Sequence, residues 1–468
     1  MLTFAVILSQ FCCISAGAAF TPDVEIYSDA YYMVNMDLGT VIAAKNEHKR
    51  CYPASITKLM TAIVAMENCS DLSMPMTVTY DATNEFWEGD PNKEGAGTCG
   101  IAIGQTNLTM IDCLYGLLLR SGCEAGNVIG YNIGKGEISA FVDMMNKKAK
   151  EIGCEDTHFG NTHGLWQEDN YSTPYDLYLI ARYITEKLPN LMEICNETEY
   201  VMPANASNPS PYTITNVNSL IRNTSDNPYY YEYASGMKTG SMSDYYTKSG
   251  GEWVYHTGFA NMVSTATQNG FRYMLVTVNA PYFDEDGVTK LNGHFKDSIA
   301  MYKWAFRTFG IVEVMNENTP VATVKVDMGE NADAAILKPA GSFSTLLPKD
   351  LDVSVIQPVV TITAELNVNE AVVAPVEKGQ IMGTLELLLD GETLWTTNVV
   401  ASQSIELSQF EYTMRMINSI FDKGWFKLCI VALAVLIVLD IILNAIQKSR
   451  IAMLESRQRR KANVNKKW

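Results

Sequence analysis

The sequence predicts a mixed α/β domain, a small all-β domain after it, and one transmembrane helix near the C-terminus. Three observations support this. Helical and alternating strand patterns are interleaved over residues 20–310, only short alternating runs follow over 311–405, and residues 428–446 are almost entirely apolar. With 468 residues, of which 47% are apolar and 19% charged, the chain can bury a core, so wholesale disorder is excluded.

The first domain, residues 20–310, begins with an alternating pattern that predicts a hairpin, with strands at 30–37 and 41–45 around Leu38-Gly39-Thr40. Two helices have a clear end signal in the sequence: one is followed by Gly153, and another begins at Ser172-Thr173-Pro174, with proline in its first turn. The region 196–230 is polar and is expected to be loop. Helices are expected at 55–66, 106–120, 139–152, 173–187 and 295–309, and strands at 252–257, 262–268 and 272–279.

The C-terminal third is predicted to contain an all-β domain, a helix and a membrane span. Its expected parts are a β-rich domain (311–405), a linker helix (406–424), a transmembrane helix (425–447) and a basic tail (448–468). The apolar stretch 428–446 has 19 residues, about 28 Å as a helix, close to the thickness of a bilayer core. A buried core helix is the alternative explanation.

The charge distribution indicates which side of the membrane each part occupies. The net charge is −17, which argues against a nucleic-acid partner. The segment after Ile446, however, carries eight basic residues and one acidic residue, Glu455. Such a segment is expected in the cytoplasm, with the acidic body outside. Residues 1–19, which have an apolar run followed by small residues, are expected to be a signal peptide.

The sequence offers little support for a metal site, a cofactor or a disulfide framework. His158 and His163 are five residues apart and belong to no metal-binding motif, and no dinucleotide or Walker glycine pattern occurs. Seven cysteines lie between the predicted signal peptide and the span, an odd number without a C-x-x-C pair, so their pairing stays open.

The motif with the clearest chemistry is Ser55-Ile56-Thr57-Lys58, at the start of an apolar helix. Residues i and i+3 share a helix face, so the amine can reach the hydroxyl. A serine is a good nucleophile only if a base takes its proton, and a lysine can do so in its neutral form, which burial or a second cation favours. The same spacing recurs at Ser235–Lys238, so this motif by itself is also compatible with a surface lysine.

Two further triplets have matching chemistry. Lys238-Thr239-Gly240 offers a cation and a hydroxyl for a carboxylate, and its glycine permits close approach of a ligand. The triplet 121–123, Ser-Gly-Cys, follows a helix. A competing triplet, Ser225-Asp226-Asn227, lies in the polar loop and is rejected for that reason.

In this order, the motifs resemble those of the serine-type D-alanyl-D-alanine carboxypeptidases, the low-molecular-weight penicillin-binding proteins of peptidase family S11. The resemblance covers about residues 30–310. It rests on the stretches KNEHKRCYPASITKLMTAIVAME, LYGLLLRSGCEAGNVI, FVDMMNKKAKEIGCEDTHFGNTHGLWQEDNYSTPYDL, SGMKTG and NGFRYMLVTVNAP. It implies a D,D-peptidase/β-lactamase-like antiparallel sheet flanked by helices, with a β-rich domain and a membrane anchor following.

The resemblance also implies roles for individual residues. Ser55 would be the acylated nucleophile, Lys58 the general base and Ser121 a proton shuttle to the leaving D-alanine. The backbone N–H groups of Ser55 and Ser241 would form the oxyanion hole. Lys238 and Thr239, helped by Arg272, would hold the substrate carboxylate. The residues expected to bind the substrate are Lys238, Thr239, Gly240, Arg272 and Cys123.

Cys123 departs from the family pattern, which has asparagine at this position. A thiol donates and accepts hydrogen bonds more weakly than an amide, so we expect altered substrate positioning, with Asn127 as a partial substitute. Two hypotheses compete with the carboxypeptidase: a catalytically weak or inactive wall-binding scaffold, and a β-lactamase. The β-lactamase would need a deacylating glutamate, and its nearest counterpart, residues 186–190, breaks the E-x-x-L-N pattern.

As a carboxypeptidase, the protein would remove the terminal D-alanine from peptidoglycan stem pentapeptides through an acyl-enzyme, without a cofactor. β-Lactams would act as covalent inhibitors. The expected location is the bacterial cell membrane, with a single span and an extracytoplasmic catalytic domain.

Overall fold

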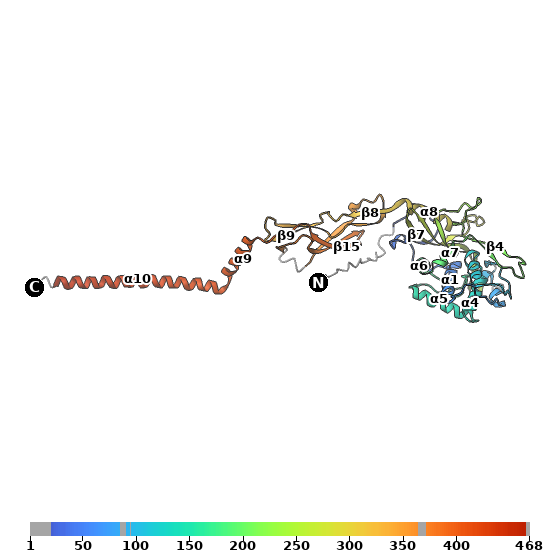
Figure 1. Ribbon diagram of the computed structural model, residues 1–468, viewed down its shortest axis with the longest axis horizontal. Helices are drawn as coiled ribbons and strands as arrows, with labels where there is room; N and C mark the ends of the chain where they lie inside the picture. Colours follow the sequence, from blue (N-terminus) through green and yellow to red (C-terminus); the bar gives the residue numbers. More distant parts are fainter. Residues whose placement is uncertain (1–19, 85–89, 94, 364–370, 465–468) are drawn as a thin grey trace. The chain divides into compact units, whose positions relative to one another are not determined.

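The computed structural model describes residues 20–84, 90–93, 95–363 and 371–464, which form two compact units (Figure 1). The first unit contains most of the chain up to Val314, and the second contains most of the β-rich segment and the C-terminal helices. The predicted signal peptide, residues 1–19, and the end of the predicted basic tail, 465–468, lie outside the described residues.

A five-stranded antiparallel sheet forms the centre of the first unit, in the order β2-β1-β7-β6-β5. This confirms the antiparallel sheet that the resemblance implied, and the predicted hairpin is present as β1 and β2. The strands are β1 (Ala30–Asn35), β2 (Thr40–Lys45), β5 (Ala234–Ser249), β6 (Glu252–Gln268) and β7 (Phe271–Pro281).

Helices cover both faces of this sheet because its strands are apolar on both sides. Along β1, Tyr31 and Met33 pack in one buried cluster with residues of α8, whereas Tyr32 and Val34 pack in another with residues of α1 and α6. Figure 1 shows α8 and the group α1, α4 and α5 on opposite sides of β7. The helices are α1 (Thr57–Asn68), α2 (Tyr80–Asn84), α3 (Met110–Leu119), α4 (Cys123–Ile133), α5 (Ile138–Ile152), α6 (Pro174–Lys187), α7 (Pro189–Asn196) and α8 (Gly293–Thr308).

Capping residues in the sequence correctly predicted one end each of helices α5 and α6. Helix α5 ends at Gly153, whose φ of 99° closes the helix in the left-handed conformation that glycine adopts easily. Helix α6 begins after Thr173, whose side chain accepts a hydrogen bond from the backbone of Asp176, and has Pro174 in its first turn. Both ends agree with the sequence expectation.

Several elements differ from the expectation. The predicted strands 252–257 and 262–268 are one strand, β6, which pairs with β5 along nearly its whole length. The predicted loop 196–230 contains a hairpin of β3 (Glu199–Met202) and β4 (Tyr212–Thr215), and helices α4 and α7 were missed. Pairing between distant strands and burial of short helices determine these elements, and neither leaves a strong local periodicity.

The β-rich segment is all-β, as predicted, and continues into two helices. It has a six-stranded sheet in the order β12-β14-β15-β10-β9-β13 and a two-stranded sheet of β11 and β8. The strands are β8 (Phe309–Met315), β9 (Ala322–Asp327), β10 (Ala334–Pro339), β11 (Phe343–Pro348), β12 (Gln357–Ile362), β13 (Val372–Val373), β14 (Ile381–Leu389) and β15 (Glu392–Ala401).

The predicted linker helix is α9 (Gln409–Asp422), and the apolar stretch lies in α10 (Gly424–Val464). Among the described residues, α10 contains the one helical stretch that is long and apolar enough to cross a bilayer. The helix runs on without a break into the basic segment, so no change of secondary structure marks the predicted boundary at 447/448.

The described cysteines form no disulfide bond. All seven between Cys51 and Cys195 are buried free thiols, and Cys429 is an exposed one.

Candidate active site

Ser55 lies in a single 3-10 turn, η1 (Ala54–Ile56), which leads directly into α1. Lys58 follows one turn later, and its Nζ lies 2.9 Å from the Ser55 hydroxyl oxygen. Gly164 permits this turn, because a Cβ added there would lie 1.8 Å from the carbonyl oxygen of Ala54. The hydroxyl and the amine are therefore in direct contact, as the i, i+3 spacing predicted.

Lys58 is completely buried, and its amine is held by three neighbours. Besides contacting Ser55, Nζ donates a hydrogen bond of 2.6 Å to the carbonyl oxygen of His163 and lies 3.5 Å from the Cys123 sulfur. Burial, with a smaller contribution from Lys58, lowers the pKa of His163 well below its usual range, so this imidazole is neutral. These contacts orient the Lys58 amine toward the nucleophile.

Helix α4, which the sequence analysis missed, positions the second motif. Ser121 has a left-handed backbone with φ 62°, and Cys123 is the first residue of α4. The Cys123 thiol is buried; burial raises its pKa, and the opposing effect of Lys58 is smaller. A protonated thiol therefore occupies the position at which the resemblance implies an asparagine amide.

Strand β5 brings the third motif against η1. A Cβ on Gly240 would lie 2.7 Å from the carbonyl oxygen of Pro53, so glycine allows the two segments to touch. Lys238 is buried, and its Nζ donates to the carbonyl oxygen of Thr239 at 2.9 Å. Burial first, and then the charge of Lys58, lower the pKa of Lys238 to about 7. A bound anion would stabilise its charged form.

These elements surround one cavity of about 530 Å³. Side chains of all three motifs line it, and the two buried lysines lie behind them. The motif residues at its surface, together with the expected oxyanion residue of β5, are Ser55, Ser121, Cys123, Thr239 and Ser241.

Arg272 does not join this site, which contradicts its predicted contact with the substrate carboxylate. It lies at the start of β7, paired in register with Thr267, whereas Lys238 lies opposite Val263. This separates the two by four residues along the strands, roughly 13 Å. Its guanidinium instead forms an ion pair of 2.6 Å with Asp37 beyond the β1 strand. The sequence could not reveal this, because strand register decides which end of β7 faces the cavity.

Two cations that the sequence analysis missed line the cavity: Arg120 and Lys290. Lys290 belongs to the segment between β7 and α8, where it pairs with Phe283 and lies over the ring of Tyr282. Buried His294, at the start of α8, also lines the cavity. No spacing in the sequence links this segment to Ser55; only the fold of the β7–α8 connection brings it there.

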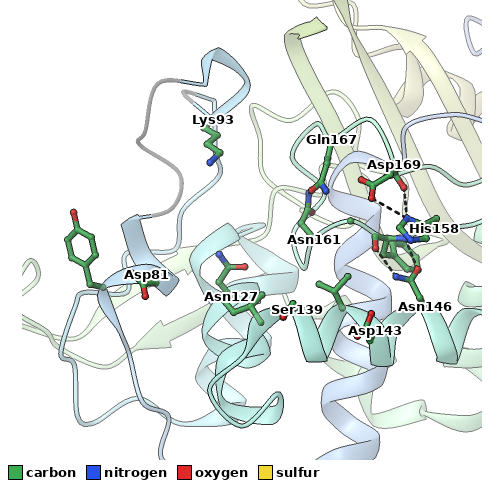
Figure 2. Close-up of a pocket in the computed structure, with 15 residues that line it drawn as sticks. Asp81, Lys93, Asn127, Ser139, Asp143, Asn146, His158, Asn161, Gln167 and Asp169 are labelled. Carbon is green, nitrogen blue, oxygen red and sulfur yellow. Dashed lines mark hydrogen bonds and ion pairs between the residues drawn. The ribbon is translucent and has the colours of Figure 1, made fainter. Parts of the chain in front are cut away.

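Asn127, the expected partial substitute for the motif asparagine, does not line the cavity of Ser55. Its side-chain oxygen accepts a hydrogen bond of 2.6 Å from the Thr162 hydroxyl, and the residue lines a different cavity, shown in Figure 2. That cavity is surrounded by α4, α5 and the segment 158–169. In Figure 2, His158 is bonded to Asp169. The expected substitution of Asn127 for the motif asparagine stays a prediction.

The rejected and competing motifs do not line the catalytic cavity. The amide of Asn227 donates to the carbonyl oxygens of Ser219 and Arg222 within its own loop. Glu186, the nearest counterpart of a β-lactamase glutamate, forms an ion pair with Arg182 on the exposed side of α6. Neither residue lines the cavity.

Comparison with known protein families gives two matches that together cover most of the chain. Residues 16–282 match the family described as D-alanyl-D-alanine carboxypeptidase. Residues 309–407 match the C-terminal domain of penicillin-binding protein 5.

Curated relatives and solved structures agree with these matches. The chain is 27% identical over 380 residues to the D-alanyl-D-alanine carboxypeptidase DacF of Bacillus subtilis, covering 81% of this chain and 86% of the relative. It is 26% identical over 392 residues to DacA of Escherichia coli, covering 82% and 85%. In fold, it resembles the crystal structure of the carboxypeptidase DacD from Francisella tularensis, with a TM-score of 0.58, 20% identity, and coverage of 83% and 96%.

Proposed function

Because the chain belongs to the D-alanyl-D-alanine carboxypeptidase family, we propose that it removes the terminal D-alanine from peptidoglycan stem pentapeptides, with Ser55 as nucleophile. The observation that carries the assignment of Ser55 is the 2.9 Å contact between its hydroxyl and the amine of buried Lys58, at the wall of the catalytic cavity. A hydroxyl in contact with a desolvated amine is the arrangement that serine activation requires.

Acylation begins when the Lys58 amine takes the Ser55 proton. The Ser55 oxygen attacks the carbonyl carbon between the two D-alanines, and the developing oxyanion accepts hydrogen bonds from the backbone N–H groups of Ser55 and Ser241. The C–N bond then breaks, and the proton passes through Ser121 to the leaving amine. Water, deprotonated by Lys58, hydrolyses the ester and releases the shortened peptide.

The terminal carboxylate of the substrate is the second part of the proposal. Lys238 would supply charge from beneath the cavity and Thr239 a hydroxyl at its surface. Lys290, which lines the cavity, would supply the further cation first assigned to Arg272. Cys123 would contact Lys58 in the way the amide does in relatives, but with a weaker acceptor.

The length and composition of α10 support a proposal for membrane attachment. We propose that its apolar stretch spans the bilayer, with the basic segment in the cytoplasm and the catalytic domain outside. The proposed domain limits are 20–310 for the catalytic domain, 311–405 for the β-rich domain, 406–424 for the linker helix and 425–447 for the span. The β-rich domain would act as a spacer between membrane and wall.

The test is to incubate the detergent-solubilised protein with a labelled penicillin and, separately, with a D-Ala-D-Ala peptide. We expect a covalent adduct on Ser55, located by mass spectrometry, and release of free D-alanine. The S55A variant should lose both. A folded wild-type protein that forms no adduct and releases no D-alanine would refute the proposal.

A further inference from the structure

A second cavity, of about 670 Å³, lies beside the catalytic cavity and has no role in the mechanism above. Its walls combine aromatic rings with carboxylates. Four rings line it, those of Tyr52, Tyr171, Tyr245 and Phe259, together with the acidic side chains of Asp29 and Glu168.

The two cavities share a wall. Ala54, which precedes the nucleophile, packs in one apolar cluster with Met242, Phe259, Tyr52 and Tyr245. Met242 lines the catalytic cavity on one side of this cluster, and Tyr52 lines the second cavity on the other. A ligand in the catalytic cavity can therefore extend into the second cavity across a surface of apolar side chains.

The charge of the second cavity is negative. In the part of the chain that the structure describes, neither the Asp29 nor the Glu168 carboxylate has a hydrogen-bond or ion-pair partner, and both residues are exposed. The cation in the lining, Arg50, is already paired with Asp156 at 2.6 Å. Its guanidinium lies 4.2 Å from the centre of the Tyr171 ring, so one ring of this cavity already holds a cation.

We propose that this second cavity binds the side-chain ammonium group of the residue that precedes the two terminal D-alanines of the substrate. The inference rests on the proposed function. Aromatic faces attract an ammonium group through their quadrupoles, and unpaired carboxylates add charge complementarity. A primary amine on the substrate would meet both kinds of group here. We call this site the ammonium pocket.

The direction of the substrate supports this assignment. In the proposed mechanism, the substrate carboxylate lies at Thr239 and the scissile carbonyl at Ser241, so residues upstream in the substrate continue along β5 toward Tyr245. From Ser241 to Tyr245 the strand advances roughly 13 Å. One D-alanine and the residue before it span about 7 Å when extended. The side chain of a diamino acid can bridge the remaining distance.

The experiment compares two peptides with the full chain in detergent: Nα-acetyl-L-Lys-D-Ala-D-Ala, with a free side-chain amine, and the same peptide acetylated on that amine. We expect the wild type to have an about tenfold higher kcat/KM for the peptide with the free amine. The difference should arise from a lower KM, with kcat nearly unchanged. The double variant D29N/E168Q, which keeps side-chain size, should reduce this preference below about threefold while leaving the acetylated peptide unaffected.

The control is D169N, which removes one negative charge at the residue next to Glu168. Asp169 lines the separate cavity of Figure 2. The D169N variant should keep the full preference. If D29N/E168Q retains the wild-type preference, or if D169N loses it equally, the ammonium pocket is refuted.

A binding measurement separates this inference from the proposed function. The inactive S55A variant is titrated with both peptides by calorimetry. If the wild type releases no D-alanine but S55A binds the free-amine peptide more tightly, the function fails and the pocket stands. If D-alanine is released equally well from both peptides, the function stands and the pocket fails. Competition by a peptide-free disaccharide, with no effect of the amine, would assign the cavity to a saccharide and overturn the proposal.

Discussion

At the scale of single residues, Cys123 is the most informative position. The thiol lies 3.5 Å from the Lys58 amine, in van der Waals reach but as a poor hydrogen-bond acceptor. Burial raises its pKa, so it does not provide a thiolate to pair with the amine. Lys58 is therefore held mainly by the His163 carbonyl and by Ser55.

The substitution C123N should raise activity. An amide oxygen would accept from Lys58, and the amide N–H could donate to the substrate. A gained hydrogen bond contributes about 1 kcal/mol, or roughly a fivefold increase in kcat/KM for D-alanine release. C123A serves as the control, because it removes the thiol without adding an amide and should not exceed the wild type. Equal rates for C123N and C123A would show that no amide is needed here.

Lys238 should make substrate binding dependent on pH. Burial lowers its pKa to about 7, so the free enzyme loses this charge as the pH rises through that value. A carboxylate binds the protonated form, and KM should increase by as much as about tenfold per pH unit above pH 7. In K238R the guanidinium stays charged, and KM should change little over the same range. Steady-state kinetics from pH 6 to 9 measure KM for both proteins. If KM of K238R rises with pH as it does in the wild type, a group other than Lys238 titrates.

At the scale of elements, the contact between β5 and η1 determines whether the motifs converge. β5 is the edge strand of the sheet, and Gly240 lets it touch the turn that carries Ser55. Neither element reveals this contact in its own sequence pattern.

The substitution G240A tests this contact. The added Cβ would lie 2.7 Å from the Pro53 carbonyl oxygen and 3.1 Å from the Ile56 nitrogen, which forces β5 away from η1. We expect a loss of about 1–3 kcal/mol in stability, seen as a lower Tm, and a fall in penicillin acylation of at least tenfold. The control is G341A in the β-rich domain, where a Cβ meets no atom within 4 Å. Normal acylation by G240A would mean that the strand position is not critical.

The elements also show where sequence reasoning succeeds. Helices α5 and α6 were predicted to within a residue or two because their caps, Gly153 and Thr173, are local signals. Helix α4 and the continuous strand β6 were missed. Both depend on partners that are distant in sequence, so their own residues carry too little periodicity to identify them.

At the scale of the whole molecule, topology is the property that can be tested most directly. Helix α10 joins an apolar stretch to a basic one, and the rest of the chain is acidic. We expect protease added to spheroplasts to digest the catalytic and β-rich domains while a C-terminal tag stays protected until the membrane is permeabilised. A tag that is cleaved in intact spheroplasts would place the basic segment outside.

By itself, the sequence determined the features that depend on residues close together in the chain. These are an amine one helical turn from a hydroxyl, the ends of the longer helices, and an apolar stretch of bilayer length. These properties depend on residues close together in the chain, whose spacing is set by helix geometry. The tertiary structure alone decided that Arg272 lies at the wrong end of β7, that Lys290 lines the catalytic cavity, and that Asn127 lines another. Strand register and the packing of distant segments place these side chains, and no local pattern encodes that placement.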